Sequence, residues 1–358
     1  YNFDTSSSRR LVVMNRHTGD VLWTFNSDLG FWHNGIAAGN GRLFCLDRMP
    51  EEVAGLLKRR GQRFHGTPRL LVFDIPTGRL VWSTSEDAFG TWLGYSEEYD
   101  ILLQAGRPSR DMIAGEISEG MAAFRGSTGE PLWKNNAKYS GPCILHGETI
   151  ITDPNAYSLL TGEPVMRRNP LTGEETPWAY SRNYGCNYSI ASEYLLSFRS
   201  AAAGFFDLSN DGGTGNFGGF KSGCTSNLVA ADGVLNAPDY TRTCSCSYQN
   251  QTSLALIHNP NVETWTFNSL PLGDGPIQRI GVNLGAPGDR RADAGTLWLE
   301  YPIVGGPSPD IPIRITPESY KTFHFHSSRV SGADPRWVAA SGVAGARLAA
   351  VVPRATTL

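Results

Sequence analysis

Five short segments combine glycine with aromatic or cationic side chains, the residue types with which proteins bind sugars and anions. The segments are Gly30–Gly35, Gly90–Tyr95, Lys138–Cys143, Arg182–Cys186 and Lys221–Cys224. Aromatic rings stack on sugar faces, and cations or imidazoles hydrogen-bond hydroxyls and carboxylates. If the fold brings these segments to one space, the ligand-binding candidates are Trp32, His33, Asn34, Trp92, Tyr139, Arg182, Asn183, Tyr184 and Lys221, together with Arg199, which follows the apolar run Tyr194–Phe198.

The same side chains support two kinds of function. As a binding surface they would take a glycan or a protein partner. As a polysaccharide lyase or hydrolase, the chain would use His33, Tyr184 or Arg199 as catalytic candidates, and cations would neutralise a uronate carboxylate. No pair of catalytic groups is fixed by spacing, so we expect a non-catalytic binding module. A purely structural role in the core is the third interpretation of the aromatic residues.

Six cysteines form a second group of chemically capable residues. Cys45 lies in the apolar run Arg42–Leu46 and is expected to be a buried small hydrophobe, and Cys143 is expected to be the same. The other four fall in neighbouring segments, and we predict that they form two disulfides, in either pairing, in an oxidising compartment. A zinc or iron site on the same sulfurs is the alternative, although Cys-x-Cys is tighter than the usual metal spacing. Free thiols are the third possibility. The four residues are Cys186, Cys224, Cys244 and Cys246.

A repeated turn marks the elements that must position these residues. Thr-Gly ends an apolar run four times, and a second run follows each glycine. In the first three copies a Trp lies four residues after the glycine, and Met166 takes that place in the fourth. Each copy predicts a β-hairpin, because glycine adopts the positive φ of a tight turn without steric cost. The copies are Leu11–Trp23, Leu70–Trp82, Met121–Trp133 and Tyr157–Met166.

This hairpin resembles the outer-strand motif of the quinoprotein-type, or PQQ-like, β-propeller repeat family. The spacing between the repeated glycines is 59, 51 and 33 residues, close to the roughly 40–50 residues of a propeller blade. The family includes quinone-dependent alcohol dehydrogenases and cofactor-free binding propellers of the bacterial envelope. In the dehydrogenases, adjacent cysteines and a calcium-binding carboxylate set surround PQQ. No two cysteines are adjacent here, and the candidate segments contain no Asp, although Asp47, Asp207 and Asp239 lie near enough in sequence to be checked. We therefore expect no cofactor and consider PQQ with calcium the least favoured reading.

The predicted architecture is an all-β propeller of four-stranded blades, followed by a small β-sandwich-like module. The innermost strands of the blades would place the candidate binding segments around a central funnel. The propeller covers residues 1–268, with an outer strand pair at 9–26, and a helical insertion is expected at 50–62. Pro and Gly mark a linker at 269–276, and six short strands are expected in 277–358, the fifth of them at Trp337–Ala340. The blades are expected at 30–85, 88–135, 138–168, 183–220 and 222–268. Five and a half blades predict that further blades of a longer polypeptide complete the ring, or that a partner segment closes it.

Composition limits the partners. The 358 residues carry a net charge of −3, which gives no electrostatic case for nucleic acid or an anionic membrane. No apolar run approaches the ~18 residues that a spanning helix needs. The disulfide prediction and the family resemblance place the chain in the periplasm, on the cell surface or outside the cell.

Overall fold

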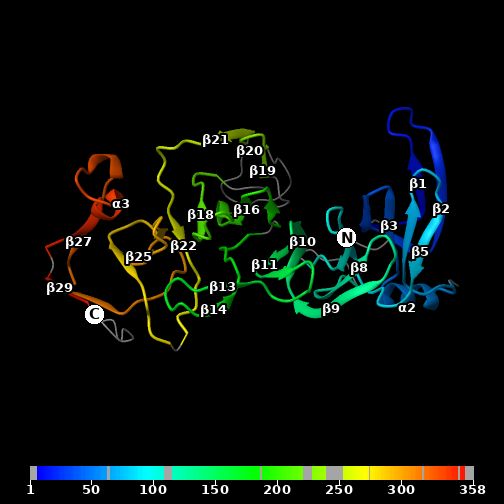
Figure 1. Cartoon of the computed structure of the whole chain (residues 1–358), viewed down its shortest axis with the longest axis horizontal. Coiled ribbons are helices and arrows are strands. Elements are labelled where there is room, and N and C mark those ends of the chain that lie inside the picture. The colour runs from blue at the N-terminus through cyan, green and yellow to red at the C-terminus, as the bar shows by residue number, and fades with distance from the viewer. Residues whose placement is uncertain are drawn as a thin grey trace. The chain divides into compact units, whose positions relative to one another are not determined.

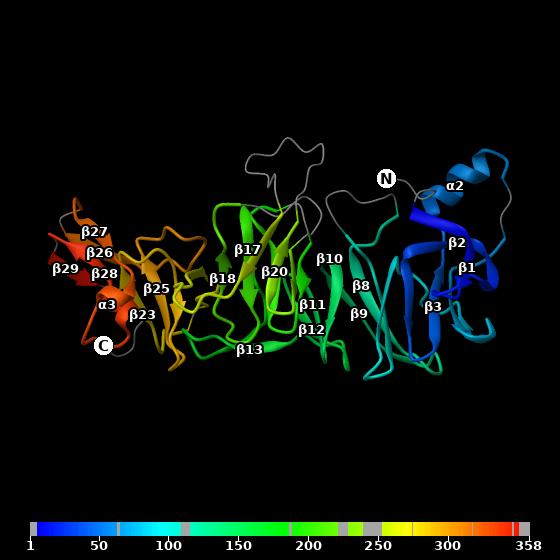
Figure 2. The ribbon, with the colours of Figure 1, turned by 90° about the horizontal axis from the view of Figure 1, so that it is seen from above.

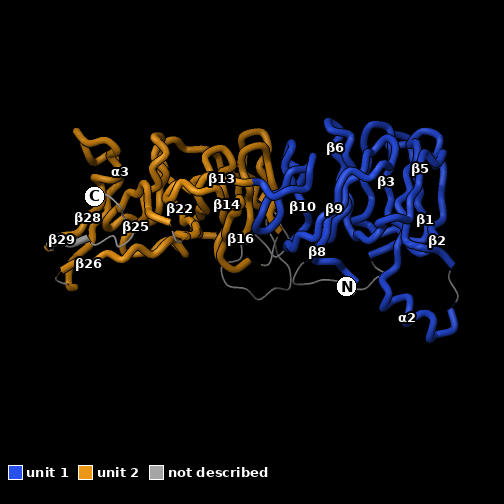
Figure 3. Tube along the Cα trace, turned by 60° about the horizontal axis from the view of Figure 1, so that its bottom comes forward, with its two compact units in different colours: residues 1–165 blue, residues 166–358 orange. Residues whose placement is uncertain are grey.

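The computed structural model describes residues 6–62, 65–108, 115–185, 188–220, 228–238, 253–273, 275–316, 318–345 and 347–350. Within these ranges the chain is almost wholly β, so the all-β prediction is confirmed. It divides into two compact units, residues 1–165 and 166–358 (Figure 3). None of the helices in the described ranges has the length and apolar character needed to cross a membrane.

Unit 1 begins with a five-stranded antiparallel sheet in chain order (Figure 1). The long strand β2 serves two partners, because its first part pairs with β1 and its last part pairs with β3. The outer pair predicted at 9–26 and the following meander are therefore one continuous sheet. Helix α2 (Glu51–Arg59) occupies the insertion between β3 and β4, with two acidic residues in its first turn and two basic residues in its last. The strands are β1 (Ser7–Met14), β2 (Val21–Gly39), β3 (Arg42–Asp47), β4 (Arg69–Asp74) and β5 (Leu80–Thr84).

The next sheet is a four-stranded antiparallel meander, β6-β7-β8-β9, the unit from which β-propellers are built. Three more strands form the next antiparallel sheet. An isolated β-bridge between Tyr157 and Pro164 extends this sheet on one side. Among the described residues no sheet closes on itself, and the number of blades stays a prediction. The strands are β6 (Trp92–Ser96), β7 (Ile101–Ala105), β8 (Glu119–Arg125), β9 (Pro131–Lys138), β10 (Ser140–His146), β11 (Thr149–Asp153) and β12 (Ala156–Ser158).

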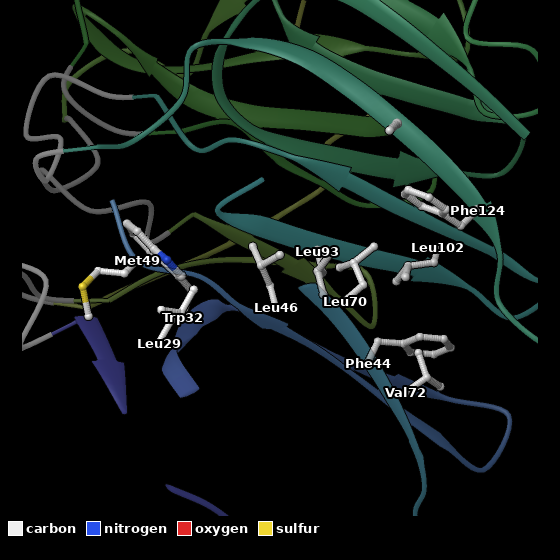
Figure 4. Packing of buried hydrophobic residues seen from close by; sticks show 11 residues of the cluster. Leu29, Trp32, Phe44, Leu46, Met49, Leu70, Val72, Leu93, Leu102 and Phe124 are labelled. Carbon is white, nitrogen blue, oxygen red and sulfur yellow. The ribbon is translucent and has the colours of Figure 1, made fainter. Parts of the chain in front are cut away.

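The central strands of unit 1 are buried on both faces, as their unbroken apolar runs require. Phe44 in β3, Leu70 in β4 and Leu102 in β7 are fully buried. They share one hydrophobic cluster, in which Trp32 lies beside Leu29 and Met49 (Figure 4). At roughly 1.5–3 kcal/mol for each fully buried large apolar side chain, such clusters provide the main stabilisation of the unit.

The Thr-Gly turns share one geometry. In each, the glycine N–H donates to the carbonyl four residues earlier at 2.8 Å, and the glycine has a positive φ, from 70° at Gly78 to 78° at Gly19. An Asn, Asp or Ser side chain at the first position often caps the turn; the Asn15 Oδ1 atom, for instance, accepts the His17 and Thr18 N–H groups. The predicted hairpins are confirmed at all four copies. A fifth turn of this kind, Asn169–Gly173, was not anticipated from the sequence.

The tryptophan of one hairpin contacts the turn of the next, a contact that we call the tryptophan latch. The indole N–H groups of Trp23, Trp82 and Trp133 donate at 2.7, 2.9 and 2.8 Å to the carbonyls of Ile75, Gly126 and Leu159. Each accepting residue lies three positions before the glycine of its turn. A Cβ atom on Gly78, Gly129 or Gly162 would approach the indole to 2.6, 2.8 or 2.4 Å. Only glycine therefore fits beneath the ring.

Unit 2 is less regular (Figure 2). Its main sheet is the meander β15-β16-β17-β18, to which β22 adds as a fifth strand. The blade expected at 222–268 has three described strands, because its last strand pairs with β18 instead of β21. The strands are β13 (Met166–Arg168), β14 (Glu175–Pro177), β15 (Ile190–Ala191), β16 (Leu195–Ser200), β17 (Ala202–Asp207), β18 (Thr214–Asn216), β19 (Val229–Ala231), β20 (Val234–Ala237), β21 (Leu254–Ile257) and β22 (Thr266–Phe267).

The last part of the chain forms three small sheets, and one of them contains a parallel pair, β23 and β25. The strand expected at Trp337–Ala340 was wrong. Residues 336–339 form a short helix, α3, whose N-cap Pro335 cannot donate to a strand ladder. The elements are β23 (Gly281–Leu284), β24 (Arg290–Arg291), β25 (Leu297–Tyr301), β26 (Ile313–Thr316), β27 (Lys321–His324), η1 (Ser327–Arg329), α3 (Arg336–Ala339), β28 (Ser341–Ala344) and β29 (Arg347–Ala350).

Candidate functional site

The predicted binding residues of unit 1 lie in different surroundings. Trp32 is only 1% exposed, and its indole donates to the Arg48 carbonyl at 2.9 Å. Tyr139 is also buried, and its hydroxyl accepts the Gly106 N–H at 2.7 Å and donates to the Gly120 carbonyl at 2.9 Å. Both rings are packed in the protein interior, where their contacts stabilise the sheets.

The other three candidates in unit 1 are more accessible. His33 is exposed and its Nε2 atom lies 2.9 Å from the Ser8 hydroxyl. Asn34 is half-buried on the same strand, and Trp92 is half-buried against the cluster that contains Tyr139. The role of these residues in ligand binding stays a prediction.

Unit 2 brings four predicted residues together. The Arg199 guanidinium lies 5.3 Å from the centre of the Tyr184 ring, a cation–π contact. Arg182 donates to the Arg199 carbonyl at 3.4 Å, and the Asn183 N–H donates to the Ser200 hydroxyl. Tyr184 is 61% exposed, whereas Arg199 is buried. Lys221 lies outside the described residues.

Of the six cysteines, two lie in the part of the chain that the structure describes and four do not. Cys45 and Cys143 are free and buried, as predicted. Burial, together with the nearby charge of Asp47, raises the pKa of Cys45 to about 12, and burial raises the pKa of Cys143 as well. Cys186, Cys224, Cys244 and Cys246 lie outside the described residues, so both the disulfides and the alternative metal site stay predictions.

A groove of ≈ 700 Å³ opens in unit 2 between the β16–β18 strands and the β19–β21 sheet. The two sheets are joined by a hydrogen bond that the buried Ser197 hydroxyl donates to the Leu228 carbonyl at 2.9 Å. Aromatic rings form one wall: Phe205 and Phe217 pack with centroids 4.8 Å apart. Gly215 makes this possible, because a Cβ atom there would come within 2.4 Å of the Phe205 ring. Both sheets therefore supply residues that line the groove.

The rim of this groove is strongly apolar. Ile257 on β21 is 77% exposed, Val262 is 64% exposed and Tyr194 is 61% exposed. Contiguous exposed apolar side chains of this size are typical of interaction surfaces on soluble proteins. The charged side chains that line the groove are few: Glu193, Asp232 and Glu263, with His258 as a neutral or cationic group.

Glu263 connects the groove to the last part of unit 2. Its Oε1 atom accepts the Ser327 N–H at 2.9 Å, and its Oε2 atom lies 3.9 Å from His324 Nε2. Burial alone would raise the pKa of Glu263, but the Ser327 hydrogen bonds and the charges of His326 and Arg290 hold it below its ordinary value. The carboxylate is therefore ionised and already hydrogen-bonded, whereas a catalytic acid or base must be free to exchange a proton with a substrate.

An aromatic cluster around Arg290 supports the same end of the groove. The guanidinium lies 5.6 Å from the Trp265 ring and 5.0 Å from the Trp337 ring. Trp337 packs edge-on against both Trp265 and Trp298. Burial lowers the pKa of Arg290, against the opposing charges of Glu263 and Asp293. Because Trp265 also lines the groove, this cluster fixes the position of its wall.

Sequence reasoning missed the groove. It treated Tyr194 as the first residue of an apolar strand, and it gave no role to Phe217, Ile257 or Val262. Each is a single apolar residue beside a turn, and nothing in the local pattern distinguishes it from a core residue. Their exposure depends on the β19–β21 sheet standing beside β16, a contact between segments far apart in the chain.

Two of the three carboxylates that lie near the candidate binding segments are engaged in the fold. Asp47 is completely buried and accepts the N–H groups of Asp28, Leu29 and Gly30, together with Arg69. Asp207 caps a turn through Ser209 and Asn210, and Asp239 lies outside the described residues. Both described carboxylates are therefore engaged in the fold, and the expectation of no cofactor stays a prediction. In the described part of the chain, no three His, Cys, Asp or Glu side chains are grouped as metal ligands.

Fold and site together define the class: an all-β chain of propeller-like meander sheets with an open apolar groove. No protein-family model matches the chain, and no curated protein matches its sequence. The similar solved structures include BamB from Moraxella catarrhalis, which has a TM-score of 0.42 and 13% identity over 64% of this chain and 61% of the BamB chain.

Two further structures show weaker likeness. The computationally designed Ika8 protein has a TM-score of 0.36 and 11% identity over 67% of this chain and 63% of its own. A quinohemoprotein alcohol dehydrogenase from Pseudomonas putida HK5 has a TM-score of 0.27 and 10% identity over 70% of this chain and 45% of its own. The chain spans less than two thirds of each of the three structures. We assign the fold from its own strand pairing and turns rather than from these likenesses.

Proposed function

We propose that the chain is a non-catalytic, exported propeller-type module of the PQQ-like class, and that the groove of unit 2 binds a protein partner. The observation that supports this is the exposed apolar rim of Ile257, Val262 and Tyr194 around a groove of ≈ 700 Å³. Aliphatic side chains bind apolar side chains of another polypeptide, whereas a glycan site needs more polar groups aimed inward.

The charged groups near the groove favour binding over catalysis. A general acid or base must be free to reach a substrate proton. Glu263 is engaged by Ser327 and His324, and the Tyr184–Arg199 pair is a cation–π contact. A glycan remains the second candidate, because the exposed ring of Tyr184 beside Arg182 and Arg199 is a stacking surface next to cations.

Two tyrosines of equal exposure separate these candidates. Tyr194 lies on the groove and Tyr184 lies beside Arg199, and both are 61% exposed. We would select a phage-displayed random peptide library on the purified chain, and screen the same chain on a glycan array. Peptides with apolar anchors are expected to bind, and Tyr194→Ala or Ile257→Ser should weaken them at least tenfold while Tyr184→Ala leaves them unchanged.

The opposite pattern would overturn the proposal. If the library yields no binder and a glycan binds in a manner that Tyr184→Ala abolishes, the functional surface is the Arg182–Arg199 region. Cleavage of the bound polysaccharide, followed as new reducing ends, would revive the lyase or hydrolase hypothesis, and its loss in Tyr184→Phe with binding retained would identify the Tyr184 hydroxyl as the catalytic group.

A further inference from the structure

The charges around the groove of unit 2 have one predominant sign. Among the described residues that line it, three are acidic, Glu193, Asp232 and Glu263, and none is a lysine or an arginine. His258 is a neutral or cationic group among them. The three acidic residues belong to separate segments, before β16, between β19 and β20, and after β21. Several carboxylates around one opening create a negative potential, which attracts a cationic partner.

Two of these carboxylates are exposed to solvent, and the third is already engaged. Asp232 is exposed in the turn between β19 and β20, where its φ is 50°, a value that Asp tolerates better than most residues. Glu193 is exposed as well. Glu263, in contrast, accepts the Ser327 N–H and is attracted by the charge of Arg290. The carboxylates accessible to a partner are therefore Asp232 and Glu193.

Glu193 acts together with the neighbouring ring of Tyr194. The Tyr194 hydroxyl donates to the Glu193 carboxylate, and this hydrogen bond and the negative charge raise the pKa of Tyr194. The ring itself is 61% exposed on the rim of the groove. An aromatic face beside a carboxylate suits an arginine guanidinium, which stacks on the ring and pairs with the oxygen atoms at the same time. A lysine ammonium has no planar face with which to stack.

The chain itself shows this combination in the wall of the same groove. The Arg290 guanidinium lies 5.6 Å from the centre of the Trp265 ring and is attracted by the charge of Glu263. Both Trp265 and Glu263 line the groove. An arginine on an aromatic ring beside a carboxylate is thus an arrangement that this fold already accommodates.

The two equally exposed tyrosines of unit 2 differ in this respect. Arg199 lies over the Tyr184 ring at 5.3 Å, whereas among the described residues no cation lies over the ring of Tyr194. On the same groove as Tyr194, the apolar side chains of Ile257 and Val262 are 77% and 64% exposed. A partner that covers this surface must therefore supply apolar side chains and a cation together.

We propose that the partner of the groove is a cationic polypeptide segment, which places apolar side chains on Ile257 and Val262 and an arginine on the ring of Tyr194 beside Glu193. A second cation of the segment pairs with Asp232. The methylene stem of an arginine also covers apolar surface while its charged end stays near water. This inference rests on the proposed protein-binding function and specifies the partner.

Four pools of short synthetic peptides test the inference. They share a mixture of Leu, Ile and Phe at the central positions and differ only in the two flanking residues, which are Arg, Lys, Gln or Glu. We would label each pool with fluorescein and follow its binding to the full chain by fluorescence polarisation. The Arg pool should bind about tenfold more tightly than the Gln pool, the Lys pool should lie between them, and the Glu pool should not bind. Added salt should weaken the Arg pool more than the Gln pool.

Variants of the chain assign these differences to single groups. Glu193→Gln and Asp232→Asn should each reduce the advantage of the Arg pool over the Gln pool about threefold, and asparagine tolerates the positive φ of position 232. Glu175→Gln neutralises an exposed residue outside the groove lining, and as the matched control it should change nothing. Tyr194→Leu keeps an apolar side chain on the rim and should remove the preference for Arg over Lys, whereas Tyr184→Leu should preserve it.

The two proposals fail in different ways. If the Gln or Glu pool binds as tightly as the Arg pool and Ile257→Ser abolishes that binding, the groove binds protein but the cationic partner is wrong. If the Arg pool binds and neither Ile257→Ser nor Glu193→Gln weakens it, the groove is not the binding site and both proposals are overturned. Absence of binding by every pool overturns the cationic partner, and the phage-displayed library then tests the proposed function separately.

Discussion

The two units use tryptophan in different ways. In unit 1, Trp23, Trp82 and Trp133 recur at a fixed distance from a glycine, and each bonds the turn of the next hairpin. In unit 2, Trp265, Trp298 and Trp337 come from unrelated positions and pack edge-on with Arg290 between two of them. Unit 1 repeats one contact between successive hairpins, whereas the clustered rings of unit 2 come from positions that share no repeated motif. The repeated contact can be predicted from a sequence motif, whereas the tryptophan cluster of unit 2 cannot.

The largest effect is expected from removing one latch. Trp82→Ala loses the packing of the indole on Gly129 and the hydrogen bond to Gly126, and we expect it to cost about 3 kcal/mol of unfolding free energy. Trp82→Phe is the control, because it keeps the ring and loses only the N–H donor, at about 1 kcal/mol. Guanidinium unfolding of the three proteins measures both. Equal costs for the two variants would show that packing on the glycine contributes little.

Alanine at two equivalent glycines sharpens the comparison within unit 1. Gly129 and Gly19 have φ values of 77° and 78°, so the backbone strain of alanine is about 1 kcal/mol at each. At Gly129 the new methyl also meets the Trp82 ring at 2.8 Å, whereas at Gly19 it meets nothing within 4 Å. We expect Gly129→Ala to cost about 2 kcal/mol more than Gly19→Ala, since overpacking adds to strain. Equal unfolding midpoints would contradict the latch geometry.

A substitution in the aromatic cluster tests unit 2. Arg290→Lys keeps the charge but replaces a planar guanidinium between Trp265 and Trp337 with an ammonium group, and we expect a loss of about 1 kcal/mol. The matched control is Arg329→Lys, where the guanidinium lies over the single exposed ring of Phe325 at 4.7 Å. That control should change the unfolding midpoint very little. A loss of similar size at both positions would mean that the cluster is no stronger than one surface contact.

The parts of the molecule that could be predicted from the sequence are those formed by residues close together in the chain. The hairpins and their turns follow from the spacing of Thr, Gly and Trp, because each turn is closed by a hydrogen bond between residues only four positions apart. The helix at 336–339 was missed because Trp337 and Val338 are good strand residues and Pro335 before them was given too little weight. The groove was missed because the exposure of Ile257 and Val262 is decided by sheet-to-sheet packing, which no local pattern encodes. The predicted funnel has the same weakness, since Trp32 and Tyr139 have a sequence environment that suits a ligand site and a core equally well.

Acidity probes unit 2 through Glu263. Its pKa is held below the ordinary value in the folded chain by the Ser327 hydrogen bonds and nearby cations, against burial. A carboxylate with a lowered folded pKa adds stability above the unfolded pKa, and that stability is lost as the pH falls through the folded pKa. Burial raises the pKa of Asp289 and of Glu300. Protonation of these two groups therefore increases the stability of the folded chain as the pH falls, which is opposite to the effect of Glu263. Melting temperatures of the wild type and Glu263→Gln should therefore differ at pH 7 and converge as the pH falls below the unfolded pKa of about 4.3 and through the lower folded pKa. A constant difference would show that the charge of Glu263 is not what stabilises this end of the groove.

Thiol chemistry gives the last test of the difference between the units, and it requires no loss of stability. Cys45 and Cys143 of unit 1 are buried with raised pKa values, so at pH 8 almost none of either is in the reactive thiolate form. Iodoacetamide should leave both unmodified in the native protein and label both after denaturation. The four cysteines of unit 2 are predicted to form two disulfides, which would make the denatured, unreduced chain four hydrogens lighter and would prevent their labelling without reductant. Six labelled cysteines in the denatured, unreduced chain would remove the disulfides, and with them the strongest reason for placing this protein in an oxidising compartment.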